Sequence, residues 1–368
     1  MVKNIYVVCP TYRKRHENSF REIGVLFLIK SVLRQDNIRL CIVDSSSKPL
    51  SVFENKPVIN NNIIYLHAPS KKEMVEKYSS IVPKAVDFCI TKEHKNFASE
   101  LERVSSWSNF IPWDKDFPSH GTLKSHFLQK RPSIGMKRNI AIAALDEVFN
   151  DGDVICYADD DDFRAAQYFN DMASFLRDND FIRISKWLTC CFDSDPNNPI
   201  CGIHNISFKQ DINGYFSLQK RKSDTLFNSK NINFCGFSVE EHYSKIKNLA
   251  FSPISYDGAM HVFSTQLWRK SVEAFGGIPP VSLGEDTCFF KSCQNYFGKN
   301  FKYDLINNKK LNFLRGSGNN ASLIQWTDNI SIDAVPQWAS QTITNVFALL
   351  KFPEKRHQLE DKISCSIK

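Results

Sequence analysis

The sequence contains no long hydrophobic run. None of its apolar stretches approaches the roughly 20 residues that a helix needs to cross a bilayer. The first residues, Met1–Tyr6, lead directly into a predicted strand and do not resemble a secretory signal. The sequence therefore predicts a cytoplasmic protein, for which any membrane association is peripheral, at the inner face of the plasma membrane.

The sequence also lacks a strong charge excess and a standard zinc motif. The formal net charge is +7 and is spread along the chain, so it does not indicate nucleic acid as a partner. Eleven cysteines, an odd number without a secretory signal, favour a reduced compartment. Cys190, Cys191, Cys201 and His204 lie close in sequence, but their spacing matches no zinc ribbon or knuckle, and adjacent cysteines share a tetrahedral ion poorly.

A run of four aspartates, Asp159 to Asp162, follows the apolar stretch Val154–Ala158. The apolar stretch predicts a buried strand, because it is short, β-branched at its start and preceded by the turn signal of residues 150–153. Adjacent carboxylates repel one another unless a cation lies among them. Ligands of open α/β sheets bind at the carboxyl ends of strands, so we expect Mn²⁺ or Mg²⁺ with phosphate here. The alternative is a solvated acidic turn.

The first part of the chain predicts a strand–helix–strand unit. Ile5–Cys9 reads as a strand that Pro10 ends, residues 19–34 as a helix, and Leu40–Asp44 as a second, parallel strand. A third short strand is expected at residues 63–66. Asp44 would then lie beside Thr11 at the carboxyl edge, where it can accept a hydrogen bond from a base or ribose. A role as a helix cap or turn residue fits Asp44 equally well.

Two further helix starts carry charged residues. Residues 132–149 predict a helix whose first turn holds Lys137 and Arg138, against the preference for acidic residues there. Cations so placed are explained if they face phosphates, although a solvated basic pair is the alternative. Glu285 and Asp286 begin another predicted helix, where acidic caps are common. Arg315 precedes a glycine-rich loop at 316–322, a weak indication of phosphate binding.

Taken in order, these segments resemble the family 2 glycosyltransferases of GT-A fold, mostly bacterial enzymes that build surface polysaccharides. The matching segments cover most of 1–50 and 133–325. They are the Pro-Thr-Tyr turn at Pro10–Tyr12, the strand ending in Asp44, the Lys137-Arg138-Asn139 helix, the aspartate run, and Gly276-Gly277 followed by Gly284-Glu285-Asp286. The resemblance implies an α/β fold with a mixed, mainly parallel sheet flanked by helices, with insertions and a C-terminal helical extension.

The resemblance also implies roles for single residues. It assigns Thr11, Tyr12 and Asp44 to a uridine-type nucleotide, and Asp160 to its ribose. The diphosphate would meet Arg138, with Lys137 and Arg315 beside it, and Asp161 with Asp159 would hold Mn²⁺ or Mg²⁺. Asp286, with Glu285 beside it, would be the general base on the acceptor hydroxyl. Which of the four aspartates binds the metal stays open by one residue.

The domain division implied by the resemblance has three parts. Residues 1–330 form the transferase domain: 1–162 is the nucleotide-sugar half with an insertion at 67–132, and 163–330 is the acceptor half with an insertion at 193–250. Residues 331–368 form the helical extension.

Two departures from the family concern the donor site. The second strand ends in one aspartate where many relatives have two, and the loop after Arg315 lacks a frequent histidine.

The sequence thus predicts an inverting, metal-dependent hexosyl- or N-acetylhexosaminyltransferase. It would move a sugar from a UDP-sugar to a glycan or lipid-linked acceptor in surface polysaccharide synthesis. One alternative is a sugar nucleotidyltransferase, but the first strand is followed by residues 10–13 and not by the glycine-rich basic loop such enzymes need. The other is a non-catalytic nucleotide-sugar-binding protein on a transferase scaffold, which the intact acidic motifs disfavour.

Overall fold

The fold was analysed in a computed structural model. It describes residues 4–13, 18–53, 62–78, 132–192, 194–197, 199–205, 208–210, 216–218, 233–234, 237–238, 260–278, 285–317 and 327–367. Most of the predicted insertion at 67–132, much of that at 193–250, Gly284 and the larger part of the glycine-rich loop at 316–322 lie outside these residues.

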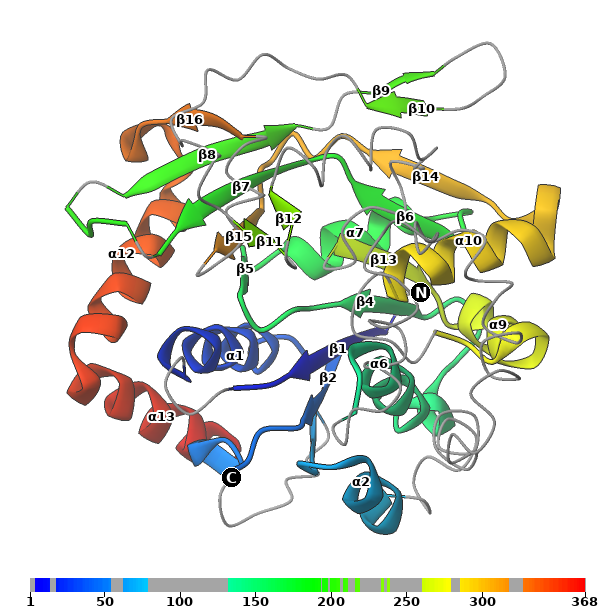
Figure 1. Cartoon of the computed structure of the whole chain (residues 1–368), viewed down its shortest axis with the longest axis horizontal. Coiled ribbons are helices and arrows are strands. Elements are labelled where there is room, and N and C mark those ends of the chain that lie inside the picture. Colours follow the sequence, from blue (N-terminus) through cyan, green and yellow to red (C-terminus); the bar gives the residue numbers. More distant parts are fainter. Residues whose placement is uncertain are drawn as a thin grey trace.

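A seven-stranded sheet forms the centre of the described chain (Figure 1). Its order is β14-β6-β13-β4-β1-β2-β3, and every neighbouring pair is parallel except the two that β13 makes. The sheet is built from β1 (Ile5–Thr11), β2 (Ile38–Asp44), β3 (Ile63–His67), β4 (Val154–Tyr157), β6 (Phe181–Ile184), β13 (His261–Ser264) and β14 (Tyr303–Ile306).

Helices cover both faces of this sheet, because its inner strands are apolar on both sides. Ile5, Val7 and Cys9 of β1 pack on one face with α1, α7 and α13, while Tyr6 and Val8 pack on the other with α2, α6, α9 and α10. The helices are α1 (Asn18–Val32), α2 (Lys71–Tyr78), α6 (Ile134–Ala143), α7 (Tyr168–Leu176), α9 (Thr265–Phe275), α10 (Glu285–Phe297), α12 (Gln337–Lys351) and α13 (Pro353–Ile367).

A second, five-stranded sheet follows from β6. The chain crosses between the sheets at Ser185, so β6 belongs to the large sheet and β7 to the small one. The order of the small sheet is β16-β8-β7-β15-β5. Its strands are β5 (Asp162–Arg164), β7 (Lys186–Cys191), β8 (Ile200–Asn205), β15 (Phe313–Ser317) and β16 (Thr327–Ile330).

Two antiparallel strand pairs complete the described strands. They are β9 (Phe208–Gln210) with β10 (Phe216–Leu218), and β11 (Asn233–Phe234) with β12 (Phe237–Ser238). Both pairs lie within 193–250, the range of the insertion predicted in the acceptor half. Because β8 belongs to the five-stranded sheet, the first part of this range is continuous with that sheet.

Helix α1 is buried on more than the usual one face, because α12 and α13 cover the side turned away from the sheet (Figure 1). Ile23 of α1 packs with Ile343 and Val346 of α12, whereas Val25 and Ile29 pack with the sheet and Ile363 of α13. The C-terminal helices therefore close one side of the nucleotide-binding half predicted from the sequence.

Two predicted boundaries need correction. β1 continues through Pro10 to Thr11, because Thr11 accepts from Ser45 on the β2 side and Pro10 faces the β4 side, where strand pairing ends at Val8. The helix predicted to run to 149 ends at Ala143 and gives way to a 3-10 turn at Asp146–Val148, in which Val148 is exposed and not buried.

The predicted fold class is confirmed: a mixed α/β fold with a mainly parallel sheet flanked by helices and a C-terminal helical extension. Within the described ranges, no helix combines the length and apolar character needed to cross a membrane. The predicted division into halves and insertions stays a prediction.

Candidate functional site

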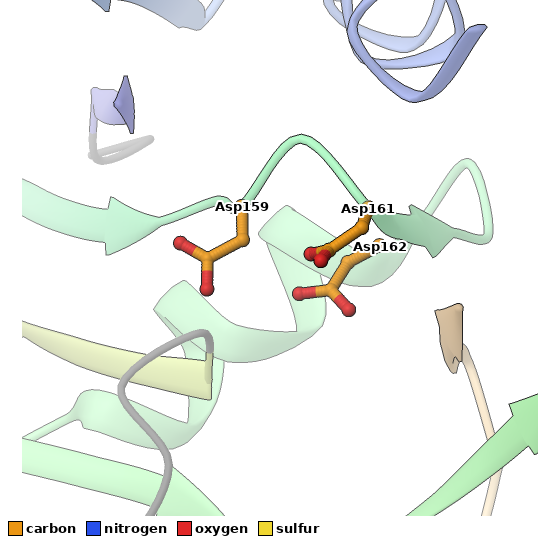
Figure 2. Close-up of side chains that lie close together, drawn as sticks. All are labelled: Asp159, Asp161 and Asp162. Atoms are coloured by element: carbon orange, nitrogen blue, oxygen red, sulfur yellow. The ribbon is translucent and has the colours of Figure 1, made fainter. Parts of the chain in front are cut away.

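The four aspartates form a tight turn between β4 and β5, at the carboxyl end of the central strand. Asp159, Asp161 and Asp162 each turn a carboxylate oxygen toward a common point, and these three oxygens lie within 4.8 Å of one another (Figure 2). Asp162 is buried, whereas Asp159 and Asp161 are half-buried. The structure thus brings together the two metal ligands predicted from sequence, Asp159 and Asp161, and adds Asp162.

Two glycines allow other elements to press against this turn. A Cβ on Gly24 of α1 would lie 2.0 Å from the carbonyl oxygen of Asp160, and a Cβ on Gly316 of β15 would lie 2.4 Å from that of Asp161. The amide of Gly316 also donates to the Asp161 carbonyl at 2.9 Å. The backbone of the turn is therefore fixed from two sides. At Gly316 the absence of a Cβ lets strand β15 approach the backbone of the turn closely.

The carboxylate of Asp160 is not one of the three that gather at a common point. It accepts from the hydroxyl of Thr11 at 2.6 Å and pairs with the guanidinium of Arg21 on α1. Burial raises the pKa of Asp160 to about 6, although Arg21 opposes this shift. Asp160 ties β1 and α1 to the aspartate turn, and its predicted ribose contact stays a prediction.

Arg138 connects the turn to α10. Its side chain is 2% exposed, donates to Glu285 at 2.6 Å and to Asp159 at 2.9 Å, and lies over the ring of Tyr157 at 4.1 Å. Burial tends to raise the pKa of Asp159, but the charges of Arg138 and Arg315 lower it overall. Arg138 is therefore held by carboxylates on both sides, and its diphosphate contact stays a prediction.

Glu285 and Asp286 form the first turn of α10, as the sequence predicts. Glu285 is buried against Arg138, and this burial raises its pKa to about 8. Asp286 is half-buried, and its charge acts on Arg138, Tyr157 and Glu285. The candidate base Asp286 thus lies beside the Arg138 bridge to Asp159.

Asp44, predicted to contact the nucleotide, and Lys137, predicted to lie beside the diphosphate, are both engaged with other protein groups. Asp44 is fully buried and accepts from Arg13 at 2.7 Å, from Tyr65 at 2.7 Å and from the amide of Ser46 at 2.8 Å. The ammonium of Lys137 donates to the Thr11 carbonyl at 2.9 Å, and burial lowers its pKa to about 8. These residues join the carboxyl ends of β1 and β2, and their nucleotide contacts stay predictions.

Arg315 and Tyr12 complete the predicted set. Arg315, half-buried on β15, lies opposite Asp162 in the strand register. Burial raises the pKa values of Asp161 and Asp162, and the charge of Arg315 opposes this shift and helps to lower the pKa of Asp159. Tyr12 follows β1 and is half-buried. Arg315 therefore belongs to the surroundings of the aspartates.

The donor set fits a hard divalent cation. Three carboxylates within reach of one point are ligands that Mg²⁺ and Mn²⁺ prefer. Both carboxylate oxygens of Asp162 are buried without a hydrogen-bond donor, and the guanidinium of Arg164 lies 3.7 Å from one of them. Burial accordingly raises the pKa of Asp162 well above its ordinary value. A carboxylate this poorly satisfied has room for a metal. Within the described residues, the cysteines near Cys190 form no comparable ligand group.

Four residues of the site are not predicted from the sequence: Arg13, Arg21, Gly24 and the third candidate metal ligand, Asp162. Arg13 and Arg21 stand in sequence near the Pro-Thr-Tyr turn, but nothing in their spacing shows that they pair with Asp44 and Asp160. Gly24 gave a usable signal, since a glycine inside a helix pattern often marks a close approach of two backbones.

Fold and site together define an α/β protein with an acidic, metal-compatible turn at the carboxyl end of its central strand. No protein-family model and no curated protein matches the sequence. Among solved structures the chain is similar to S. aureus TarS 1-349, with 13% identity, a TM-score of 0.36 and coverage of 94% of this chain and 70% of that one.

Two further solved structures are similar to the chain. TarS 1-349 in complex with UDP-GlcNAc has 10% identity, a TM-score of 0.34 and coverage of 94% and 66% of the two chains. A 4-diphosphocytidyl-2C-methyl-D-erythritol synthase from Anaerococcus prevotii has 10% identity, a TM-score of 0.30 and coverage of 96% and 100%. Likeness at this level does not carry over activity, so function rests on the site.

Proposed function

We propose that this chain is an inverting, metal-dependent glycosyltransferase of GT-A fold that uses a UDP-sugar. The acceptor would be a glycan or lipid-linked sugar of a surface polysaccharide. The observation that carries the proposal is the gathering of Asp159, Asp161 and Asp162 at the carboxyl end of β4, with Arg138 linking them to the Glu285–Asp286 turn. Arg138 thus connects two motifs that lie more than 120 residues apart in the sequence. A donor site and an acceptor base have to lie near each other in this way.

Asp159, Asp161 and Asp162 would hold the divalent cation. A cation bound there would stabilise the negative charge that develops on a departing nucleoside diphosphate. Arg315 lies beside the same carboxylates and would contribute positive charge. Thr11 and Lys137 fix the end of β1 next to the turn and would set the floor of the nucleotide pocket.

Asp286 would take the proton from the acceptor hydroxyl. It is half-buried at the start of α10, while its neighbour Glu285 is committed to Arg138. A single base opposite the leaving group gives inversion, by analogy with single-displacement glycosidases. Loss of this base in Asp286→Asn should lower the transfer rate by about 10²–10⁴-fold. Transfer at the wild-type rate in this variant would contradict the assignment of the base.

The test of the proposal is a calorimetric titration of UDP, with Mn²⁺ and then with EDTA. We expect tight binding only with Mn²⁺, and loss of this metal-dependent binding in Asp161→Ala. The matched control is Asp151→Ala, which removes an exposed aspartate at the opposite end of β4 and should bind like wild type. If UDP binds equally with EDTA, the aspartates do not hold a metal that bridges to the nucleotide.

A further inference from the structure

The positive charges around the aspartate turn differ in how far they reach solvent. Lys137, Arg138 and Arg164 are buried. Arg21 lies near the start of α1 and contacts the aspartate turn. Its side chain is 45% exposed. Arg315, the fifth positive charge near the turn, is half-buried. Arg21 is thus the most exposed of these five charges and the one most open to an anion arriving from solvent.

The guanidinium of Arg21 is held unequally at its two ends. One terminal nitrogen contacts Asp160, whose other carboxylate oxygen accepts from Thr11. The other terminal nitrogen lies 3.5 Å from Asp161, at the long end of hydrogen-bond range. Arg21 therefore has one fixed anchor and one loose contact, and the loose contact is with a proposed metal ligand.

A cation bound by Asp159, Asp161 and Asp162 would repel the guanidinium from Asp161. The contact with Asp160 would remain, because the Asp160 carboxylate is outside that group of three and is fixed by the Thr11 hydroxyl. The end of the fork released from Asp161 would then be available to an anion that reaches the aspartate turn from solvent. A planar guanidinium matches phosphate geometry with two parallel hydrogen bonds.

We propose that Arg21 is a phosphate-binding residue for a nucleoside diphosphate, positioned by the Thr11–Asp160 pair. The inference rests on the proposed function for the identity of the donor. It assigns to Arg21 the diphosphate contact that the sequence gives to Arg138. It also explains why Thr11 and Asp160 face each other: they hold the arginine in place.

The test is a set of titrations on the full chain, first with Mn²⁺ alone, and then with UDP and with inorganic pyrophosphate at saturating Mn²⁺. In Arg21→Gln the affinity for UDP and pyrophosphate should fall about tenfold, because one charge-assisted contact is lost. The affinity for Mn²⁺ should rise, because a competing positive charge leaves Asp161. Arg34→Gln, which removes an exposed arginine just beyond the other end of α1, is the control and should change neither.

In Arg21→Gln the expected fall in phosphate affinity and rise in Mn²⁺ affinity distinguish a binding role of Arg21 from a structural one. If both affinities fall, Arg21 only supports the shape of the turn and the inference is wrong. Arg21→Lys keeps the charge, so Mn²⁺ affinity should stay near wild type while pyrophosphate binding weakens through loss of the fork. Should this variant also lose Mn²⁺, the inference fails even where Arg21→Gln does not fold.

The ligands distinguish this inference from the proposed function. UDP binding that is unchanged in Arg21→Gln overturns the role of Arg21 alone. Wild-type protein that binds pyrophosphate through Arg21 but not UDP keeps the phosphate site and overturns the uridine donor. If wild type binds neither ligand, both proposals are wrong.

Discussion

Arg138 shows how a single residue can change role between sequence and structure. A cation at the start of a helix opposes the helix dipole, and the sequence explains it by an anionic ligand. The structure gives another reason, since Glu285 and Asp159 supply the negative charge from within the protein. The long-range partner, 147 positions away, cannot be derived from local spacing.

Replacement of Glu285 by glutamine should weaken metal binding. Above the raised pKa of Glu285, which is about 8, the substitution removes a negative charge near the aspartates. It leaves Arg138 to pair with Asp159 alone, which draws that carboxylate away from the cation. Loss of one charged partner in a network of this kind should lower Mn²⁺ affinity by about tenfold, equivalent to about 1.4 kcal/mol. Titration of Mn²⁺ without nucleotide measures the effect.

The control for this substitution is Glu273→Gln, at an exposed position of α9 with the same change of net charge. It should bind Mn²⁺ like wild type. Equal Mn²⁺ affinity in Glu285→Gln and Glu273→Gln would show that Glu285 does not act on the aspartate turn through Arg138.

At the scale of elements, α1 is the helix that fixes the aspartate turn. Gly24 lets it approach the backbone of Asp160, and three residues earlier in the chain Arg21 reaches the side chain of the same residue. The periodicity of residues 19–34 predicts this helix well, because its apolar spacing is a local property. The distance between this helix and the turn cannot be predicted from local sequence. It depends on Gly24, which has no Cβ, packing against the carbonyl of Asp160, far away in the sequence.

Gly24→Ala should destabilise the protein, although alanine favours helices by about 1 kcal/mol over glycine. The new Cβ would lie 2.0 Å from a backbone oxygen, and no side-chain rotation relieves such a clash. Overpacking of this kind typically costs about 1–3 kcal/mol, so the free energy of unfolding should fall on balance. Mn²⁺ affinity should fall as well, because the turn shifts.

Urea unfolding and Mn²⁺ titration of Gly24→Ala test this, with Lys30→Ala on the exposed side of α1 as the control. Stability equal to or above wild type would mean that α1 can move away without cost. The helix would then not determine the geometry of the aspartates.

At the scale of the whole molecule, the C-terminal helices are part of the structure around the site. The sequence sets 331–368 apart from the predicted transferase domain, because a helical tail gives no local sign of what it covers. In the structure, α12 and α13 both pack on α1, and Arg356 of α13 lies 3.9 Å from Glu22. Glu22 in turn pairs with Arg13, which holds Asp44, so a chain of charges runs from α13 to the end of β2.

The packing predicts that this extension unfolds together with the sheet. Ile363 of α13 is 3% exposed within the same apolar cluster as Ile5 and Val25, so Ile363→Ala should lower the free energy of unfolding by about 2–5 kcal/mol. Asp361→Ala, at an exposed neighbouring position, should change it by no more than about 0.5 kcal/mol. A single urea transition that shifts as a whole in Ile363→Ala, followed by both circular dichroism and tryptophan fluorescence, is the expected result. Two separate transitions, with only the first one shifted, would instead show that 331–368 unfolds as an independent unit. The packing of α13 on α1 would then not contribute to the stability of the site.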